Sequence, residues 1–177
     1  MSQYPMVKLG DVCEKASSSI AQKDIEMNNG AYPIYGASGK IKSVDFYKQK
    51  KEYIAIVKDG AGIGRTMLLP AYSSIIGTMQ YILPKETISI KYLYYAITSM
   101  NLAKYFSGAT IPHIYFRDYK NEILPLPNKE KQNEIVCILD KIVGLIRRRE
   151  NQLAKIDELA KSRFIAELGT LEMEVAA

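Results

Sequence analysis

Three residue types are scarce in this sequence of 177 residues, which has no tryptophan, two cysteines and one histidine. Cys13 and Cys137 lie far apart, so they form no CxxC motif, and two cysteines do not make a disulfide framework. With His113 as the one imidazole, a histidine-rich metal site is excluded, and a nucleophile–histidine–acid triad would have to converge on that residue. We therefore expect no metal ligands and no catalytic residues in this chain.

Long apolar segments are also missing. Apolar runs end after a few residues, as at 135–139, whereas a membrane-spanning helix needs about 20. The N-terminal sequence MSQYPMVKLGDV has neither a basic region followed by an apolar one nor a cleavage site. Together with the low cysteine content, these absences predict a cytoplasmic protein without a membrane partner.

The composition is that of a folded protein with a mildly basic charge. Hydrophobic residues make up 47% and charged residues 24%, which excludes a disordered chain. Lys and Arg total 24 against 19 Asp and Glu, a net charge of +5 that suggests a polyanionic partner. The length allows one domain of ordinary size and at most one long appendage.

Residues 1–127 predict a small mixed β-sheet domain with short helices. Ser89 is a suitable N-cap for a helix through residue 100, and a second short helix covers 102–106. Residues 109–127 are expected to be extended, since prolines at 112, 125 and 127 exclude a helix through this segment. Short segments rich in Tyr, Ile and Val, separated by Gly, Pro or Asp, predict the strands at 32–36, 45–47, 53–57, 65–70 and 80–84.

Residues 128–169 predict one long helix, which makes the fold class α+β. Asn128 is a good N-cap, no proline occurs from there to Leu168, and Gly169 stands where a C-cap glycine belongs. Such a helix of about 40 residues would be about 60 Å long. The remaining residues, 170–177, form a tail without an evident role.

Apolar residues recur along this helix at alternating steps of three and four, the spacing of a coiled-coil seam. A body of 127 residues has a radius of gyration of about 14 Å, so it is too small to cover the whole seam. We expect the partner to be another molecule or a second copy of the chain. A helix folded back over its own domain would account for only the first half of the seam. The seam comprises Leu139, Ile142, Ile146, Arg149, Leu153, Ile156 and Ala160.

The segment 40–58 carries six lysines and two acids, with Tyr35, Phe46, Tyr47 and Tyr53 close by. Lysines neutralise phosphates and aromatic rings supply flat contact surfaces, a mixture that suits a nucleic-acid interface. The alternative is a solvated hairpin whose lysines only keep it soluble. The lysines are Lys40, Lys42, Lys48, Lys50, Lys51 and Lys58.

Two further segments carry potential site residues. The run 58–65 has the spacing G-x-G-x-G and precedes a predicted strand, so it indicates a tight turn between strands and not a nucleotide-binding loop. Such a turn could press its backbone against a DNA phosphate, with Lys58 and Arg65 on either side. The stretch 108–117 contains His113. Its expected roles, in order of preference, are a structural hydrogen bond, a DNA contact and catalysis.

The order of several motifs resembles half of a type I restriction-modification specificity subunit. These motifs are LGDV (9–12), YPIYGASG (32–39), KDGAGIGR (58–65), GTMQYILP (77–84), GATIPHIYFRDYKNEILPLP (108–127) and KSRFIAELG (161–169). In that family each half is a target recognition domain followed by a long helix of the central conserved region. The full subunit carries two halves as an inverted pair with antiparallel helices, whereas this sequence has one.

The resemblance implies a non-catalytic subunit that selects a DNA sequence. Two copies would pair through their helices as an antiparallel coiled coil, and a two-fold dimer would read an interrupted palindrome with half-sites about one helical turn apart. The chain itself would hold no cofactor. An adenine methyltransferase subunit would dock on it and bind S-adenosylmethionine, and a restriction subunit, where present, would use ATP and Mg²⁺.

The resemblance also divides the candidate residues into two sets. Phosphate contacts are expected from the six lysines named above and Arg65. Base edges are expected to be read by polar side chains, since Gln suits adenine and Arg suits guanine. The base-reading candidates are Thr78, Gln80, His113, Tyr115 and Arg117.

Two other function classes fit the same sequence. A globular head on a coiled-coil stalk that tethers another protein predicts little DNA affinity. An enzyme that binds a phosphorylated ligand at Gly60–Gly64 predicts turnover that depends on Lys58 and Arg65.

Overall fold

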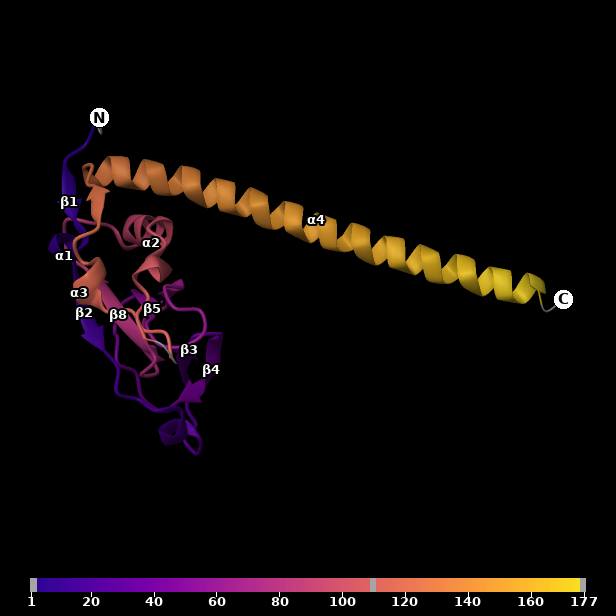
Figure 1. Cartoon of the computed structure of the whole chain (residues 1–177), viewed down its shortest axis with the longest axis horizontal. Helices are drawn as coiled ribbons and strands as arrows, with labels where there is room; N and C mark the ends of the chain where they lie inside the picture. The colour runs from indigo at the N-terminus through magenta and orange to yellow at the C-terminus, as the bar shows by residue number, and fades with distance from the viewer. Residues whose placement is uncertain (1–2, 109–110, 176–177) are drawn as a thin grey trace. The chain divides into compact units, whose positions relative to one another are not determined.

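The computed structural model describes residues 3–108 and 111–175, with side chains described as far as residue 167 (Figure 1). The α+β class expected from the sequence is confirmed, since small sheets are followed by the long helix α4 (Lys129–Val175). The chain divides into two compact units, Met1–Val136 and Cys137–Ala177. Within the described residues, no helix has the length and apolar content that a membrane crossing requires.

The division between the units lies inside α4, and not at the predicted boundary of 127/128. Asn128 caps the helix as expected, because its side-chain oxygen accepts a hydrogen bond from the backbone N–H of Lys131 at 2.9 Å. Gln132 in the next turn is buried: its amide donates to the carbonyls of Thr87 and Pro127, and its oxygen accepts from the N–H of Ser89. These bonds anchor the start of α4 in the globular unit.

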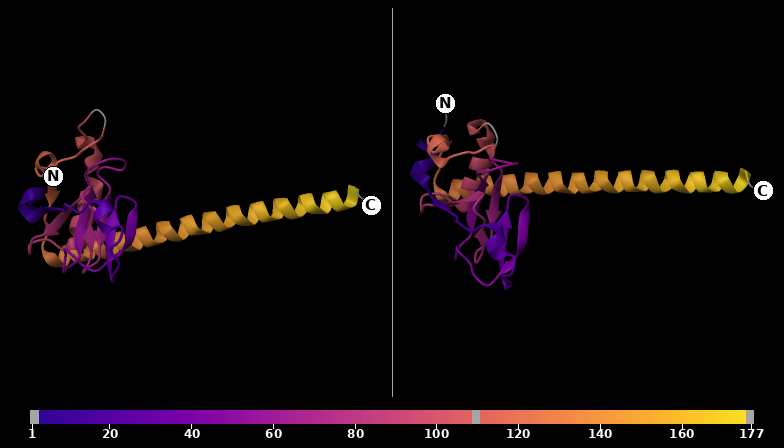
Figure 2. Two further views of the ribbon diagram at one scale, coloured as in Figure 1. Left: turned by 90° about the horizontal axis from the view of Figure 1, so that it is seen from below. Right: turned by 60° about the horizontal axis from the view of Figure 1, so that its bottom comes forward.

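The predicted helix end at Gly169 is wrong, because α4 continues through this residue to Val175 (Figure 2). Residues 170–175, expected to be a tail, are therefore helical. A glycine inside a helix costs only about 1 kcal/mol, and it ends a helix only when the residues after it support a turn. The segment after Gly169 contains Leu, Glu and Met, which are good helix formers, and no proline.

A four-stranded antiparallel sheet forms the centre of the globular unit. Its order is β2 (Cys13–Ser17), β8 (Met79–Pro84), β5 (Tyr53–Val57) and β6 (Thr66–Leu69). All five residues of β5 are buried, because successive side chains point to opposite faces and both faces are covered. Ile54 and Ile56 belong to one hydrophobic cluster, and Tyr53, Ala55 and Val57 to another.

Helix α2 (Ile90–Ser99) packs on one face of this sheet, against β5, β6 and β8 (Figure 1). Its side chains Leu93 and Ile97 lie in the cluster of Ile54, Ile56 and the buried Ile82 of β8. Ser89 is its N-cap, as predicted, since the hydroxyl accepts from the N–H of Tyr92. The short helices are α1 (Leu9–Val12), η1 (Gln22–Ile25), η2 (Leu102–Tyr105) and α3 (Phe116–Tyr119). The expectation of an extended chain is wrong at α3, because a single helical turn fits between Pro112 and Pro125.

Two smaller sheets complete the unit. One pairs β4 (Gly39–Val44) with β3 (Tyr32–Gly36) and β3 with the short β7 (Ser74–Ile75). The other pairs β1 (Met6–Lys8) with β9 (Ile123–Pro125), which brings the start of the chain beside the segment that leads into α4. The segment 45–47, predicted as a strand, is irregular, and the hairpin partner of β3 is the lysine-containing β4 instead.

Gln80, predicted to read a base edge, is instead a core residue. It is the second residue of β8 with 1% of its surface exposed, and its amide donates a hydrogen bond to the hydroxyl of Tyr119, which is fully buried. The expectation rested on the chemistry of the Gln side chain and took no account of the place of β8 inside the sheet, between β2 and β5, where residues 79–82 are all buried. Gln80 cannot reach DNA in this structure.

Replacing Gln80 with Ala is expected to lower the free energy of unfolding by about 1–3 kcal/mol, because the buried hydroxyl of Tyr119 loses this hydrogen bond. Urea denaturation measures the change. As a control, the double variant Gln80→Leu with Tyr119→Phe removes both polar partners and should be closer to wild type than Gln80→Ala. Equal stability of wild type and Gln80→Ala would contradict the role assigned to this bond.

Candidate nucleic-acid interface

The glycine-rich run is a turn between the antiparallel strands β5 and β6, as its sequence indicated. Gly60, Gly62 and Gly64 all have positive φ angles of 79–88°, a region that residues with a side chain rarely adopt. A Cβ atom on Gly64 would lie 2.6 Å from the backbone nitrogen of Ala103. Glycine is therefore required at this position both by the turn and by the close approach of η2.

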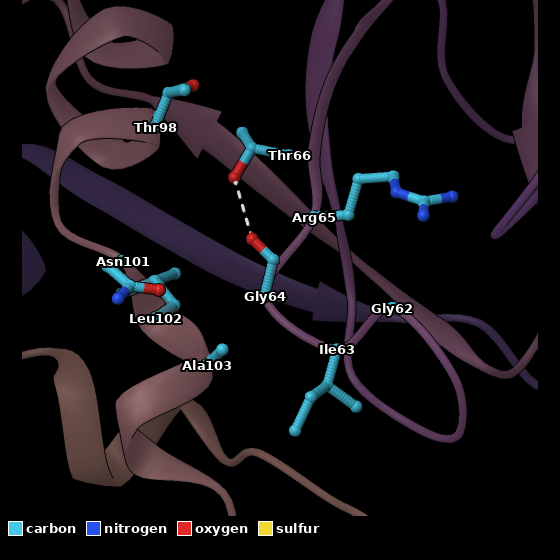
Figure 3. Close-up of a pocket in the computed structure, with 9 residues that line it drawn as sticks. All are labelled: Gly62, Ile63, Gly64, Arg65, Thr66, Thr98, Asn101, Leu102 and Ala103. Atoms are coloured by element: carbon cyan, nitrogen blue, oxygen red, sulfur yellow. Dashed lines mark hydrogen bonds between the residues drawn. The ribbon is translucent and has the colours of Figure 1, made fainter.

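A shallow pocket of about 420 Å³ lies between this turn and the residues that follow α2 (Figure 3). Its lining includes Gly64, Thr66, Thr98 and Asn101. Arg65 is the single charged residue among the described residues of the lining, and Figure 3 shows its side chain extending away from Leu102 and Ala103. These lining residues include no carboxylate or imidazole, so they supply no general acid or base.

Arg65 instead joins the glycine turn to the β3–β4 hairpin. Its guanidinium donates a hydrogen bond to the carbonyl oxygen of Ala37 at 2.8 Å, and the residue is exposed. Ala37 lies in the hairpin turn, between the end of β3 at Gly36 and the start of the lysine-containing β4 at Gly39. The cation is thus placed at the surface by two loops that are distant in the sequence.

The lysines of the segment 40–58 differ in the contacts that their ammonium groups make. Lys42 is half-buried and donates to the carbonyl oxygen of Glu26, and Lys48 lies 5.7 Å from the ring centre of Phe46. Lys58 forms an ion pair with Asp59. Among the residues that the structure describes, no hydrogen bond or ion pair occupies the exposed ammonium groups of Lys40, Lys50 and Lys51.

The aromatic residues of this segment serve mainly in packing. Tyr53, expected to offer a contact surface, is fully buried, and its hydroxyl is 2.8 Å from that of Ser73. Tyr47 makes edge contacts with the rings of Tyr32 and Tyr72. Of these three, Tyr72 is the most exposed, and its positive φ of 54° marks a tight loop conformation.

His113 is held against the end of β5 by its side chain and its backbone. Its Nδ1 lies 2.7 Å from a carboxylate oxygen of Asp59, and Asp59 also pairs with Lys58. The neighbouring residue Ile114 donates its backbone N–H to the carbonyl of Lys58 at 2.9 Å. Partial burial by itself would raise the pKa of Asp59, but hydrogen bonds from Lys58 and His113 outweigh it, and the net pKa is lowered.

Tyr115 and Arg117 extend this group along the surface. The rings of His113 and Tyr115 are nearly parallel, 22° apart in plane and 6.3 Å apart between centres. The guanidinium carbon of Arg117 lies 4.7 Å from the centre of the Tyr115 ring, a cation–π contact. The Nε atom of Arg117 is 3.5 Å from a carboxylate oxygen of Asp118.

Thr78 lies beside the same group. It is exposed, and its carbonyl oxygen accepts hydrogen bonds from the backbone N–H groups of Lys58 and Asp59. Four of the five base-reading candidates are therefore brought together, and Gln80 is left out. Sequence reasoning missed Asp59 and Asp118, although each directly follows a predicted cation in the chain.

Metal binding receives no support from the described part of the chain, where His, Cys, Asp and Glu side chains form no group of three or more that could hold an ion. Cys13 is buried and Cys137 is exposed, and both are free thiols. Burial raises the pKa of the Cys13 thiol to about 12, and its Sγ–H donates to the carbonyl of Leu9.

Sequence comparison gives two related specificity subunits. A putative type I restriction enzyme specificity subunit of Haemophilus influenzae is 26% identical over 120 residues, which cover 66% of this chain and 31% of that protein. The MjaIX type I restriction enzyme specificity subunit of Methanocaldococcus jannaschii is 26% identical over 87 residues, covering 47% of this chain and 20% of the relative. The aligned part of this chain spans less than a third of either relative.

Solved structures with the same fold include specificity subunits. The S subunit of a type I system from M. genitalium matches with a TM-score of 0.66 and 18% identity, over 78% of this chain and 38% of that structure. The HsdS subunit of Thermoanaerobacter tengcongensis matches with a TM-score of 0.61 and 19% identity, over 81% and 38% of the two chains. At identities this low, the TM-scores show that the fold is shared and carry no argument about function.

The family comparison covers most of the chain. Residues 1–158 match the model of the type I restriction modification DNA specificity domain, which spans the globular unit and the first part of α4 beyond it. The motifs that suggested this resemblance in the sequence lie largely within that range. The chain therefore belongs to the family of type I restriction-modification DNA specificity domains.

Proposed function

We propose that this chain selects a DNA sequence for a type I restriction-modification system without catalysing a reaction itself. The observation that carries the proposal is the surface group formed by Lys58, Thr78, His113, Tyr115 and Arg117, in a member of a DNA specificity family. Polar side chains that are exposed and also held in place suit base recognition, since reading a base edge requires fixed donors.

Phosphate contacts are assigned to the cations that are exposed and have no partner within the described residues. Lys40, Lys50 and Lys51 are exposed and unpaired among the described residues, so they can neutralise phosphates without first breaking an ion pair. Arg65 supports the same role from the glycine turn. Lys42, Lys48 and Lys58 contribute charge nearby, although each already contacts another residue of the chain.

The helix beyond Val136 is proposed to pair with a second copy of itself. Ile142, Ile146, Leu153 and Ile156 of the predicted seam are all exposed, and a stripe of this kind is unfavourable in water. The seam is nearly symmetric in sequence, because Ile142 and Ile156 lie at equal separations on either side of Arg149. An antiparallel copy would therefore match apolar residues with apolar residues, in support of a two-fold dimer.

A two-fold dimer would present two recognition units to DNA, and its target would be an interrupted palindrome. In this proposal an adenine methyltransferase subunit docks on the dimer and carries S-adenosylmethionine. A restriction subunit, where one takes part, uses ATP and Mg²⁺. This chain supplies the sequence selection and holds no cofactor.

Selection from a library of randomised DNA duplexes tests the proposal. The purified full chain, alone and with the methyltransferase subunit, is expected to enrich two matching half-sites separated by a fixed spacer. The competing function, a head on a coiled-coil stalk that tethers a protein, predicts no enriched sequence in either sample. Failure of both samples to enrich a sequence would overturn the proposed function.

Replacing Lys50 and Lys51 together with Ala should weaken binding to all duplexes about equally. The slope of log K against log salt concentration is negative, and loss of two phosphate contacts is expected to reduce its magnitude by roughly two. Fluorescence anisotropy over a salt series measures this slope. Glu52→Gln is the matched control, since it changes charge in the same loop without removing a cation, and an unchanged slope in the double lysine variant would refute the phosphate role.

Leu153→Asp combined with Ile156→Asp should convert the dimer into monomers, because four carboxylates would enter a shared apolar seam. Sedimentation equilibrium gives the molar mass. The control variant Asn151→Asp with Lys155→Asp places the same number of carboxylates on the polar side of the helix and should remain dimeric. A dimer mass for the seam variant would exclude this seam as the interface.

A further inference from the structure

We infer that Arg117 reads a guanine in the major groove, that Tyr115 and Asp118 hold its guanidinium in the reading orientation, and that Asp59 positions this group through His113. The inference rests on the proposed function and deepens it by naming the base and the residues that select it. Its basis is the set of contacts around Tyr115. Arg117 contacts an aromatic ring and a carboxylate there, whereas Lys40, Lys50 and Lys51 are exposed and unpaired among the described residues.

The guanidinium of Arg117 is exposed and yet restrained on two sides. Its side chain is 76% exposed, and its charged plane contacts the ring of Tyr115 while its Nε faces the carboxylate of Asp118. Fixing a flexible arginine side chain costs rotamer entropy, so restraint before binding lowers the entropic cost of recognition. The contact at Nε leaves the two terminal nitrogens of the fork for a ligand.

This pair of terminal nitrogens matches the edge of guanine. Guanine presents two acceptors, O6 and N7, in the major groove, and a bidentate contact from Arg is the commonest specific protein–DNA contact. A phosphate could also accept two hydrogen bonds from Arg. The local charges favour the base, because Arg117 faces Asp118 and Lys58 faces Asp59, so the group has far less excess positive charge than the lysine segment.

The backbone that carries Tyr115 and Arg117 is fixed in the globular unit at both ends. Before Tyr115, the side chain of Ile114 is buried and its N–H bonds to the carbonyl of Lys58. After Arg117, Tyr119 is fully buried and bonded to Gln80. The exposed residues between these anchors lie on a short segment with little freedom to move.

Asp59 extends this restraint to the aromatic ring. Its carboxylate holds the His113 ring by Nδ1, and that ring lies nearly parallel to Tyr115. His113 is further fixed by backbone hydrogen bonds with Ser107 in both directions, at 2.8 and 2.9 Å. Asp59 does not itself face the proposed guanine, and its role is to position the residues that do.

The test compares base preferences selected by full-length variants from the same randomised duplex library. Wild type is expected to prefer guanine at one position of each half-site. Arg117→Lys keeps the charge but loses the planar fork, so it should reduce that preference about tenfold or more while the salt slope stays near wild type. Tyr115→Leu should reduce the preference at the same position, and Lys120→Ala, a nearby exposed cation, should leave the preference unchanged.

Asp59→Ala and Asp59→Asn separate positioning from folding. Asn retains an oxygen that can accept from His113, so it should restore most of the guanine preference that Ala loses. A fall in affinity for all sequences together in Arg117→Lys, or an unaltered preference at every position, would overturn the inference while leaving the proposed function intact. If wild type enriches no sequence at all, the proposed function fails, and this inference fails with it.

Discussion

Two backbone hydrogen bonds hold the candidate interface together. Ile114 donates to the carbonyl of Lys58, and Gly60 donates to the carbonyl of Pro112, each at 2.9 Å. They join the end of the buried strand β5 to a segment more than 50 residues later in the chain. Every residue of β5 is buried, so Lys58 and Asp59 directly follow a well-packed strand. The half-buried His113 and the exposed Tyr115 and Arg117 take their positions from this strand.

The surface cations fall into two physical classes, and this difference organises the proposed mechanism. Lys40, Lys50 and Lys51 are exposed and unpaired among the described residues, which suits contacts to a phosphate backbone that is the same at every step. Arg117 is instead restrained by an aromatic ring and a carboxylate. Affinity can therefore come largely from one class and sequence preference from the other.

Local signals in the sequence predicted the elements that depend on local chemistry. The runs at 32–36 and 53–57 are strands, Ser89 caps α2, and Asn128 caps α4, because composition and capping decide these features. Non-local features escaped prediction: the pairing of β1 with β9, the burial of Gln80, and the contact of Asp59 with His113 across 54 positions. The prediction of a helix end at Gly169 was wrong because a glycine ends a helix only where the residues after it also favour a turn. Here those residues favour a helix.

In the proposed pair of helices, Arg149 would decide how the two copies align. It is the one charged residue of the predicted seam, and its guanidinium donates a hydrogen bond to Gln152 at 2.9 Å. A polar residue in an apolar seam costs stability, and in coiled coils it selects one register over others. The alignment of two antiparallel helices fixes the distance between whatever lies at their far ends. Arg149 would thereby help to set the spacer between two DNA half-sites without contacting DNA.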